Sequence, residues 1–392
     1  MPRGSLPALA LAIALALLLG HQQGSNGWIW LLGWAIGWLL VRGGFGFSGP
    51  IRRALNDKEW EVLAPLAALL LLLVLGSGLL FWLAEQAGLD LRPSRAPLSL
   101  TLAIGAFLFG IGMQVARRCA SGTLASAAQP DGAFGVTLMG LAVGVFIGSL
   151  QRPHLEKLIP GAWPPVVLVE RLPLALAVLS QLAILLVLLL AVVALFRFQP
   201  PARRLPHPAH PPRDLGTAPT VIGLSLLLLL VFAVSGEPWK VLWGLGLSSA
   251  HLAKAAGWDP QGSLFWGSST RMQLLTSPWL QQEAVVVNLG VIFGAWTAGK
   301  LRDPEQPSVI HRKSLSQSWL RHGIGGLLMG YGGFLSYGCN ISSFLGGVMS
   351  FSLHGWLWLI AAVAGSAFWL SCERLIGRNE RANGIDPPST TI

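Results

Sequence analysis

Two cysteines occupy matching positions in the two halves of the chain. A Gly-x-Gly motif at residues 110–112 precedes Cys119, and another at residues 330–332 precedes Cys339, each with six residues between motif and cysteine. The two motifs are offset by one constant interval (339 − 119 = 220 and 330 − 110 = 220). A thiol is a weak hydrogen-bond donor, which can hold an anion without trapping it. The spacing therefore predicts two thiols that face one central axis.

Small polar residues follow both thiols. Ser121 comes two positions after Cys119, and Asn340 and Ser342 come one and three positions after Cys339. Hydroxyl and amide groups at these positions are predicted to contact the same bound solute as the thiols. The alternative for each cysteine is an ordinary small apolar residue of a helix-packing surface. Cys372 has no counterpart in the other half and is interpreted in this second way.

The composition is that of a polytopic membrane protein. Of the 392 residues, 53% are hydrophobic and 11% are charged, against about 25% charged in soluble domains. The mean hydropathy is +0.60. Backbone groups in lipid need internal hydrogen-bond partners, so an all-α fold with about ten spanning helices is expected. The predicted spans are residues 6–21, 27–42, 62–86, 98–117, 133–150, 172–197, 217–235, 283–299, 321–338 and 356–374.

The net charge of +10 lies in short loops, where Lys and Arg set membrane topology, and it does not indicate nucleic-acid binding. Basic segments at 42–58, 197–213, 300–321 and the C-terminal tail place both termini in the cytoplasm, provided that residues 239–252 dip into the membrane and return. Arg117 and Arg118 are either interfacial anchors of this kind or part of an anion-attracting vestibule.

The chain divides at composition changes. The expected units are an extra N-terminal helix (1–26), a first membrane repeat (27–197), a Pro-rich basic cytoplasmic linker (198–216), a second repeat (217–376) and a cytoplasmic tail (377–392). Five spans separate the two Cys motifs, and an odd number inverts one relative to the other. Residues 119–132 and 339–355 are too short to span, so each is predicted to form a re-entrant half-helix of an inverted-topology repeat.

A second pattern is repeated at an offset of 200. An apolar-Gly-apolar-Ser sequence contains Gly46 and Ser48 in the first half and Gly246 and Ser248 in the second. Glycine interruptions at corresponding places in two repeats point to a midplane site. These four residues are therefore predicted to line the constriction of a pore.

The sequence lacks a phosphate-binding loop, a dinucleotide fingerprint, His-x-x-Glu-His and Cys-x-x-Cys. No acidic residue falls well inside a predicted span, although an ion-coupled carrier often has one there. These features favour a channel-like transporter without a cofactor or metal, rather than a pump or an enzyme. Three alternatives remain: a pore for another small solute, a membrane-embedded sulfurtransferase or thiol redox protein, and a non-transporting scaffold.

The two motifs that end at Cys119-x2-Gly122 and Cys339-Asn340 resemble those of the YeeE/YedE family of bacterial inner-membrane sulfur transporters. The resemblance implies an hourglass-like fold in membrane lipid, with thiosulfate or a similar small sulfur-containing anion passed along cysteine thiols. It also implies a separate small soluble sulfur-carrier protein as partner. At a third family cysteine position, between two aromatic residues, this chain has Gly46. The resemblance then implies a relay with one thiol missing or a different sulfur species.

Overall fold

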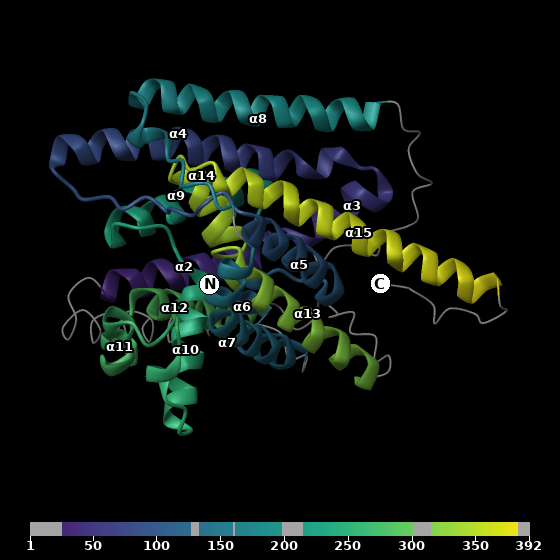
Figure 1. Ribbon diagram of the computed structural model, residues 1–392. Coiled ribbons are helices and arrows are strands. Elements are labelled where there is room, and N and C mark those ends of the chain that lie inside the picture. Colours follow the sequence, from purple (N-terminus) through teal and green to yellow (C-terminus); the bar gives the residue numbers. More distant parts are fainter. Residues whose placement is uncertain (1–25, 127–132, 160, 198–214, 301–314, 383–392) are drawn as a thin grey trace.

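The computed structural model describes residues 26–126, 133–159, 161–197, 215–300 and 315–382, and it is helical through most of them (Figure 1). The predicted first helix, most of the linker and residues 383–392 of the tail lie outside this part of the chain. The last described helix continues to Ala382, six residues beyond the predicted end of the second repeat at residue 376.

The helices of the first half follow the predicted spans, with short elements between them. Their bounds are α2 (Asn26–Gly43), α3 (Ser48–Asp57), η1 (Trp60–Leu63), α4 (Ala64–Ala87), α5 (Leu100–Ala116), α6 (Ala120–Ala125), α7 (Ala133–Leu158), η3 (Leu168–Glu170) and α8 (Leu174–Arg197). Local signals explain several ends: the Ser99 hydroxyl caps the start of α5, and Gly88 ends α4 in the left-handed conformation (φ 66°).

The second half has a similar series. Its elements are α9 (Thr217–Ser235), α10 (Val241–Ala255), η4 (Pro260–Gly262), α11 (Ser269–Thr276), η5 (Trp279–Gln281), α12 (Glu283–Lys300), α13 (Leu315–Leu335), the π-helical turn η6 (Asn340–Leu345), α14 (Gly346–Met349) and α15 (His354–Ala382). The predicted short re-entrant segments after the two cysteines are thus short helical turns, followed by the long helices α7 and α15.

Seven helical segments of the described chain are long and apolar enough to cross a membrane, which confirms an all-α polytopic membrane protein. These segments are Asn26–Asp57, Trp60–Ala87, Leu100–Ala125, Ala133–Leu158, Leu174–Phe196, Thr217–Ser235 and His354–Ile376. Helices α12 and α13 form where spans are predicted, but they fall outside this apolar set. The total of about ten spans therefore stays a prediction.

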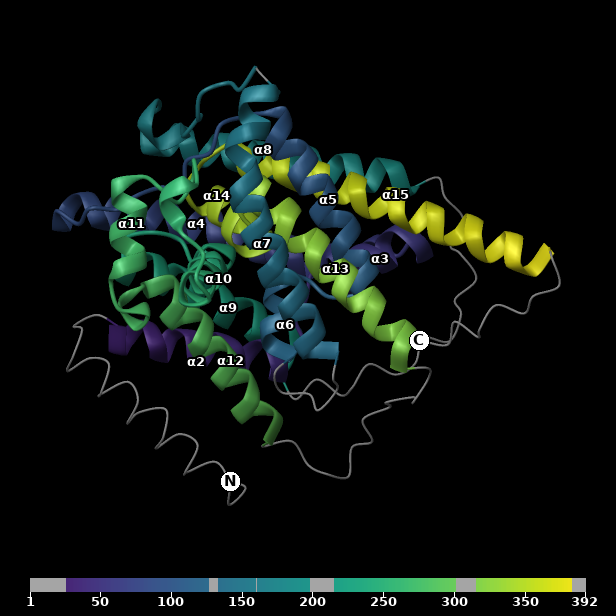
Figure 2. The same cartoon turned by 60° about the horizontal axis from the view of Figure 1, so that its bottom comes forward.

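Burial separates the outer helices from the central ones. Only 17% of the apolar stretch in Leu174–Phe196, within α8, is buried within the protein, against 61% of that in Leu100–Ala125, which joins α5 and α6. Helix α8 lies at the outside of the molecule beside α4 (Figure 1). Leu and Val side chains cover its exposed surface, as lipid contact requires. Helices α5, α7 and α13 lie side by side (Figure 2) and form the centre.

Glycines allow the backbones of α5 and α13 to touch. A Cβ atom added at Gly105 would lie 2.6 Å from the Gly332 carbonyl oxygen, and one added at Gly112 would lie 2.7 Å from the Gly325 carbonyl oxygen. The two contacts are related by the sequence offset, since 105 + 220 = 325 and 112 + 220 = 332. Small residues permit this close helix packing in membranes, where lipid supplies no hydrophobic force between helices.

The other helices that contact α5 and α13 are also related by the offset of 220 residues. Helix α5 packs against α13 and α15, and α13 packs against α5 and α7. A shift of 220 residues carries α7 (133–158) to residues 353–378, within or beside α15, and carries α6 (120–125) to residues 340–345, the bounds of η6. The central helices of the two halves therefore have equivalent neighbours.

The glycine crossing gives a stability prediction. Gly112→Ala places a methyl group against the α13 backbone, so we expect it to lower the free energy of unfolding by about 1–3 kcal/mol. Gly135→Ala in α7 is the matched control, because no described atom lies within 4 Å of its added Cβ. Alanine also favours helix over glycine by roughly 0.5–1 kcal/mol, so the control should be neutral or slightly stabilising. Equal thermal unfolding midpoints of the two purified variants in detergent would contradict this account of the crossing.

Candidate functional site

Cys119 lies at the point where α5 ends and α6 begins. Its side chain is 2% exposed, and its sulfur accepts a hydrogen bond from the Gly122 backbone N–H at 3.3 Å. The sulfur therefore caps α6 as a serine oxygen would. The Ser121 hydroxyl lies 3.4 Å from the same sulfur, and either group can be the donor. Two of the predicted site residues are thus in direct contact.

Cys339 caps η6 in the equivalent place and is fully buried. Its sulfur accepts the backbone N–H of Ser342, and the Ser342 hydroxyl accepts the backbone N–H of Cys339 at 2.9 Å, which completes a capping box. The same hydroxyl lies 3.5 Å from the sulfur. In the first half residue 122 is glycine, so the hydroxyl beside that thiol comes from Ser121, one position earlier.

The backbone around the two thiols is duplicated. The residue two positions before each cysteine, Arg117 or Tyr337, has a left-handed conformation (φ 55° and 65°) that is uncommon outside glycine. The flanking backbone hydrogen bonds also match: Arg117 N to Gln114 O and Tyr337 N to Phe334 O at 3.3 Å, and Thr123 N to Cys119 O and Ser343 N to Cys339 O at 2.8 Å. The matching motifs in the sequence therefore fold into matching turns.

The structure also brings Asn340 and Ser48 to one residue, Met113 of α5. The Asn340 amide nitrogen lies 3.8 Å from the Met113 sulfur, and the Ser48 hydroxyl donates to the Met113 carbonyl oxygen at 3.2 Å. The buried Asn340 carbonyl oxygen has no hydrogen-bond partner among the described residues. Because α6 contacts η6, both thiols, their serines and Asn340 belong to one central region.

Gly46 lies in the short loop between α2 and α3. The rings of Phe45 and Phe47 on either side of it are 5.5 Å apart in an edge-to-face arrangement. A Cβ added at Gly46 would have no heavy atom within 4 Å. The left-handed residue of this loop is Gly44 (φ 58°), not Gly46. Neither space nor backbone conformation therefore requires glycine at position 46.

Gly246 and Ser248 have a different local structure from Gly46 and Ser48. Helix α3 begins at Ser48, whereas α10 begins at Val241, seven positions before Ser248, so both second-half residues lie inside a helix. The offset of 200 thus does not relate equivalent backbone. The Ser248 hydroxyl donates to the Gly244 carbonyl at 2.7 Å and accepts from the Trp279 ring N–H at 3.0 Å, and Val145 lies beside Gly246.

Two residues that contact the site were not predicted from the sequence: Met113, which contacts Asn340, and Gln114, whose carbonyl oxygen accepts from the Arg117 N–H. The Gln114 side chain is fully buried at the end of α5, where its amide oxygen accepts from Arg52 Nε at 3.2 Å. A polar amide inside an apolar span, five residues before a motif cysteine, was the available signal. Met113 carried no such signal, because methionine is ordinary in a membrane helix.

Comparison with known proteins gives relatives over nearly the full length. The chain is 30% identical to a thiosulfate transporter, TsuA, of Spirochaeta thermophila over 358 residues, covering 86% of this chain and 95% of that protein. It is 27% identical to the thiosulfate transporter TsuA of Escherichia coli, covering 87% and 93%. A probable transporter, YedE of Escherichia coli, is 30% identical over 156 residues, covering 38% of this chain and 36% of that protein.

A family model described as sulphur transport matches residues 42–368, which include both cysteine motifs and all the central helices. The transporter names of the relatives agree with the transport interpretation of the sequence. Since the family model and two relatives cover most of its length, the chain belongs to the sulphur transport family that includes the YeeE/YedE proteins.

Proposed function

We propose that this membrane transporter carries thiosulfate across the bacterial inner membrane, with Cys339 and Cys119 as successive contacts along the path. The observation that carries the proposal is the pair of buried thiols in duplicated turns, on short helices that touch. The names of the two full-length relatives support thiosulfate as the substrate. The transported anion leaves chemically unchanged, so the chain acts as a transporter and not as an enzyme.

The proposed orientation places both termini in the cytoplasm. Basic residues concentrate at 42–58, 197–213, 300–321 and 374–381, which is expected of cytoplasmic loops and tails. The exchanged packing of the central helices supports two inverted repeats, 27–197 and 217–376, joined by the basic linker 198–216 and flanked by an extra helix (1–26) and a tail (377–392). Thiosulfate then enters from outside beside Cys339 and leaves beside Cys119.

Each site contributes weak, neutral donors. Each cysteine sulfur accepts a backbone N–H, which leaves its S–H free to turn toward an anion. The Asn340 amide group gives up only a 3.8 Å contact with a thioether when it turns toward the same anion. Ser121 and Ser342 add hydroxyl donors. Weak donors suit a path in which each binding step must also allow release.

Two partners complete the proposal. Membrane lipid covers the apolar surface of α8 and the other outer helices. A small soluble sulfur-carrier protein, implied by the family resemblance, receives sulfur at the cytoplasmic face.

Four further residues are proposed to line the transport path. Gly46 lines it from the loop between α2 and α3, Ser48 from the start of α3, and Gly246 and Ser248 from α10.

Thiosulfate uptake by cells without their own importers tests the two thiols. We expect Cys119→Ala and Cys339→Ala each to reduce uptake by roughly tenfold or more, since each removes a hydrogen bond to a charged solute. Cys372→Ala is the matched control, because that half-exposed cysteine lies outside both motifs. Absence of uptake by well-inserted wild type would exclude thiosulfate as the substrate. Full uptake by both alanine variants would exclude the thiols as contacts of the transported anion. A covalent sulfur adduct on either thiol during turnover would favour a sulfurtransferase.

Position 46 tests whether a third thiol can be added. The open space around Gly46 accommodates a cysteine without displacing neighbours, so we expect Gly46→Cys to insert and fold normally. If the path lacks one thiol contact at this loop, the variant should transport thiosulfate faster than wild type. Gly46→Ser controls for side-chain volume and for a hydroxyl donor, and it should not reproduce the gain. Equal rates for wild type and Gly46→Cys would show that no thiol step is missing here.

A further inference from the structure

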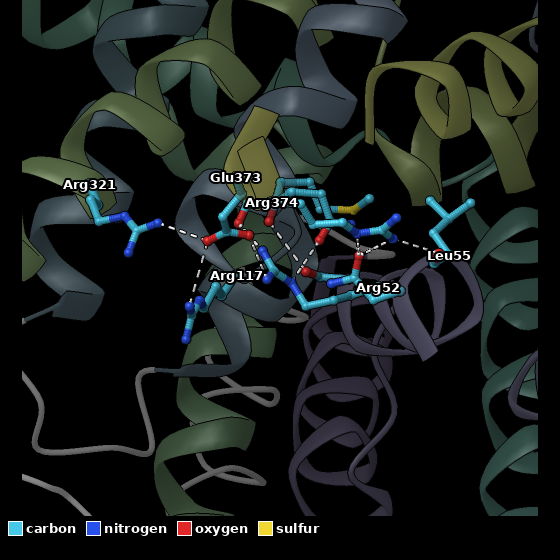
Figure 3. Close-up of polar contacts among 10 residues, drawn as sticks. Arg52, Leu55, Arg117, Arg321, Glu373 and Arg374 are labelled. Atoms are coloured by element: carbon cyan, nitrogen blue, oxygen red, sulfur yellow. Dashed lines mark hydrogen bonds and ion pairs between the residues drawn. The ribbon is translucent and has the colours of Figure 1, made fainter. Parts of the chain in front are cut away.

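Three arginines surround one glutamate at the end of the path that leads from Cys119. Figure 3 shows the Glu373 carboxylate between Arg321 and Arg117 on one side and Arg52 on the other. The guanidinium nitrogens of Arg52, Arg321 and Arg117 lie 2.9, 3.0 and 3.8 Å from its oxygens. Four separate elements contribute: α3, α5, α13 and α15. The cluster carries more positive than negative charge.

The three guanidiniums are not held equally. Arg52 also donates to the side-chain oxygen and the backbone carbonyl of Gln114, at 3.2 and 3.0 Å, so its position is determined by α5. The described polar contact of Arg117 and of Arg321 is with Glu373, and their side chains are 42% and 47% exposed. These two guanidiniums can therefore turn toward a second anion while Arg52 keeps the helices together.

The backbone directs Arg117 to this place. It adopts the left-handed conformation that ends α5, where glycine is the usual residue, two positions before Cys119. Its counterpart Tyr337 does the same before Cys339, and there the phenol donates to Glu156 at 2.9 Å while Arg152 lies 3.6 Å above the ring. At each end, the residue beside the thiol thus reaches a charged group on the long helix that follows the other thiol, α15 for Arg117 and α7 for Tyr337. The Arg117 end gathers three guanidiniums around Glu373, whereas at the Tyr337 end Arg152 pairs with Glu156 and Arg271 lies close enough to interact with both.

We propose that Arg117 and Arg321 form an oxyanion-binding site at the mouth beside Cys119, where Glu373 is a resident carboxylate that the transported anion displaces. Guanidinium groups bind sulfonate oxygens as they bind carboxylate oxygens, through charge-assisted hydrogen bonds. The inference rests on the proposed path for its role in release, but oxyanion binding itself requires no transport. The site recognises oxygens, so sulfate should bind as well as thiosulfate, and discrimination for the terminal sulfur is left to the thiols.

Competition from Glu373 explains how such a site can still release its anion. Three arginines without the carboxylate would hold a dianion tightly, whereas a carboxylate tethered to α15 replaces the departing anion at once. The same carboxylate helps to hold α3, which Arg374 also binds through the Leu55 carbonyl at 2.8 Å. Anion arrival therefore exchanges one partner of Arg117 and Arg321 without breaking this second attachment of α15 to α3.

Anion binding to the Cys119→Ala/Cys339→Ala protein tests the site directly. This variant lacks both thiols, and nanodiscs of phosphatidylcholine exclude anionic lipid headgroups as competitors. Its binding of sulfate and of thiosulfate is measured by calorimetric titration. We expect both anions to bind with similar affinity. Adding Arg117→Gln or Arg321→Gln should weaken both by roughly tenfold, and Glu373→Gln should tighten both. Arg53→Gln is the matched control, since it removes the same charge from α3 at a residue paired with Glu59.

Transport by otherwise wild-type protein gives a second readout. Arg321→Gln should raise the KM for thiosulfate roughly tenfold in membrane vesicles of one orientation, the one that presents this mouth, and leave it unchanged in the other. Sulfate should inhibit from the same side alone. Absence of sulfate binding to the thiol-free protein, or binding indifferent to Arg117→Gln, would overturn the inference even if wild type transports thiosulfate. Absence of transport with intact binding would instead count against the proposed function.

Discussion

The close approach of α5 and α13 is the constraint on which the site depends. Glycine pairs let the two backbones touch at two levels, and each helix ends within a few residues of a cysteine. Because Gly105 meets Gly332 and Gly112 meets Gly325, the two helices are related by exchange of the halves. The turn that follows α5, with Cys119 and α6, is then positioned in the same way as the turn that follows α13, with Cys339 and η6. The two thiols reach a common region because the helices that carry them cannot slide or separate independently.

Buried thiols are a physically reasonable way to make an anion path at this depth. A lysine or arginine among the apolar side chains around Cys339 would carry a large desolvation cost and would bind an anion too firmly for release. A thiol is nearly apolar when the path is empty and becomes a donor when an anion arrives. The capping bonds from the Gly122 and Ser342 N–H groups use sulfur lone pairs, so in the empty state each thiol satisfies one backbone donor at its helix start.

Much of this arrangement could be predicted from the sequence, because the signals were either long or repeated. Apolar length predicted most of the helices, and the offset of 220 predicted the equivalence of α6 and η6 around the two cysteines. The shorter apolar-Gly-apolar-Ser pattern did not mark equivalent local structure in the two halves. Four residues of common types can match in sequence even where one copy lies in a loop and the other in a helix. The helix α10 starts seven residues too early for Ser248 to correspond to Ser48.

The contacts of the charged cluster could not be predicted, because they join positions far apart in the chain. Arg52 meets Glu373 across 321 residues and Gln114 across 62. Charge counting assigned Arg52 and Arg321 to cytoplasmic loops and left Arg117 as an interfacial anchor or part of an anion-attracting vestibule, and neither interpretation pointed to a shared carboxylate. Only the crossing of α3, α5, α13 and α15 brings them together, and that crossing follows from packing rather than from any local motif.

The two halves therefore share a backbone and differ in charge. At matching left-handed positions the chain has Arg117 in one half and Tyr337 in the other, and the helices opposite supply Glu373 to the first and an Arg152–Glu156 pair to the second. A strictly symmetric path would treat an anion alike from both sides. Here one mouth holds three guanidiniums around a single carboxylate, while at the other the Glu156 carboxylate pairs with Arg152, accepts the Tyr337 phenol and interacts with Arg271, which lies over the Phe265 ring. The duplicated fold supplies two equivalent thiol sites, and the unequal side chains around them supply the difference between the two ends of the path.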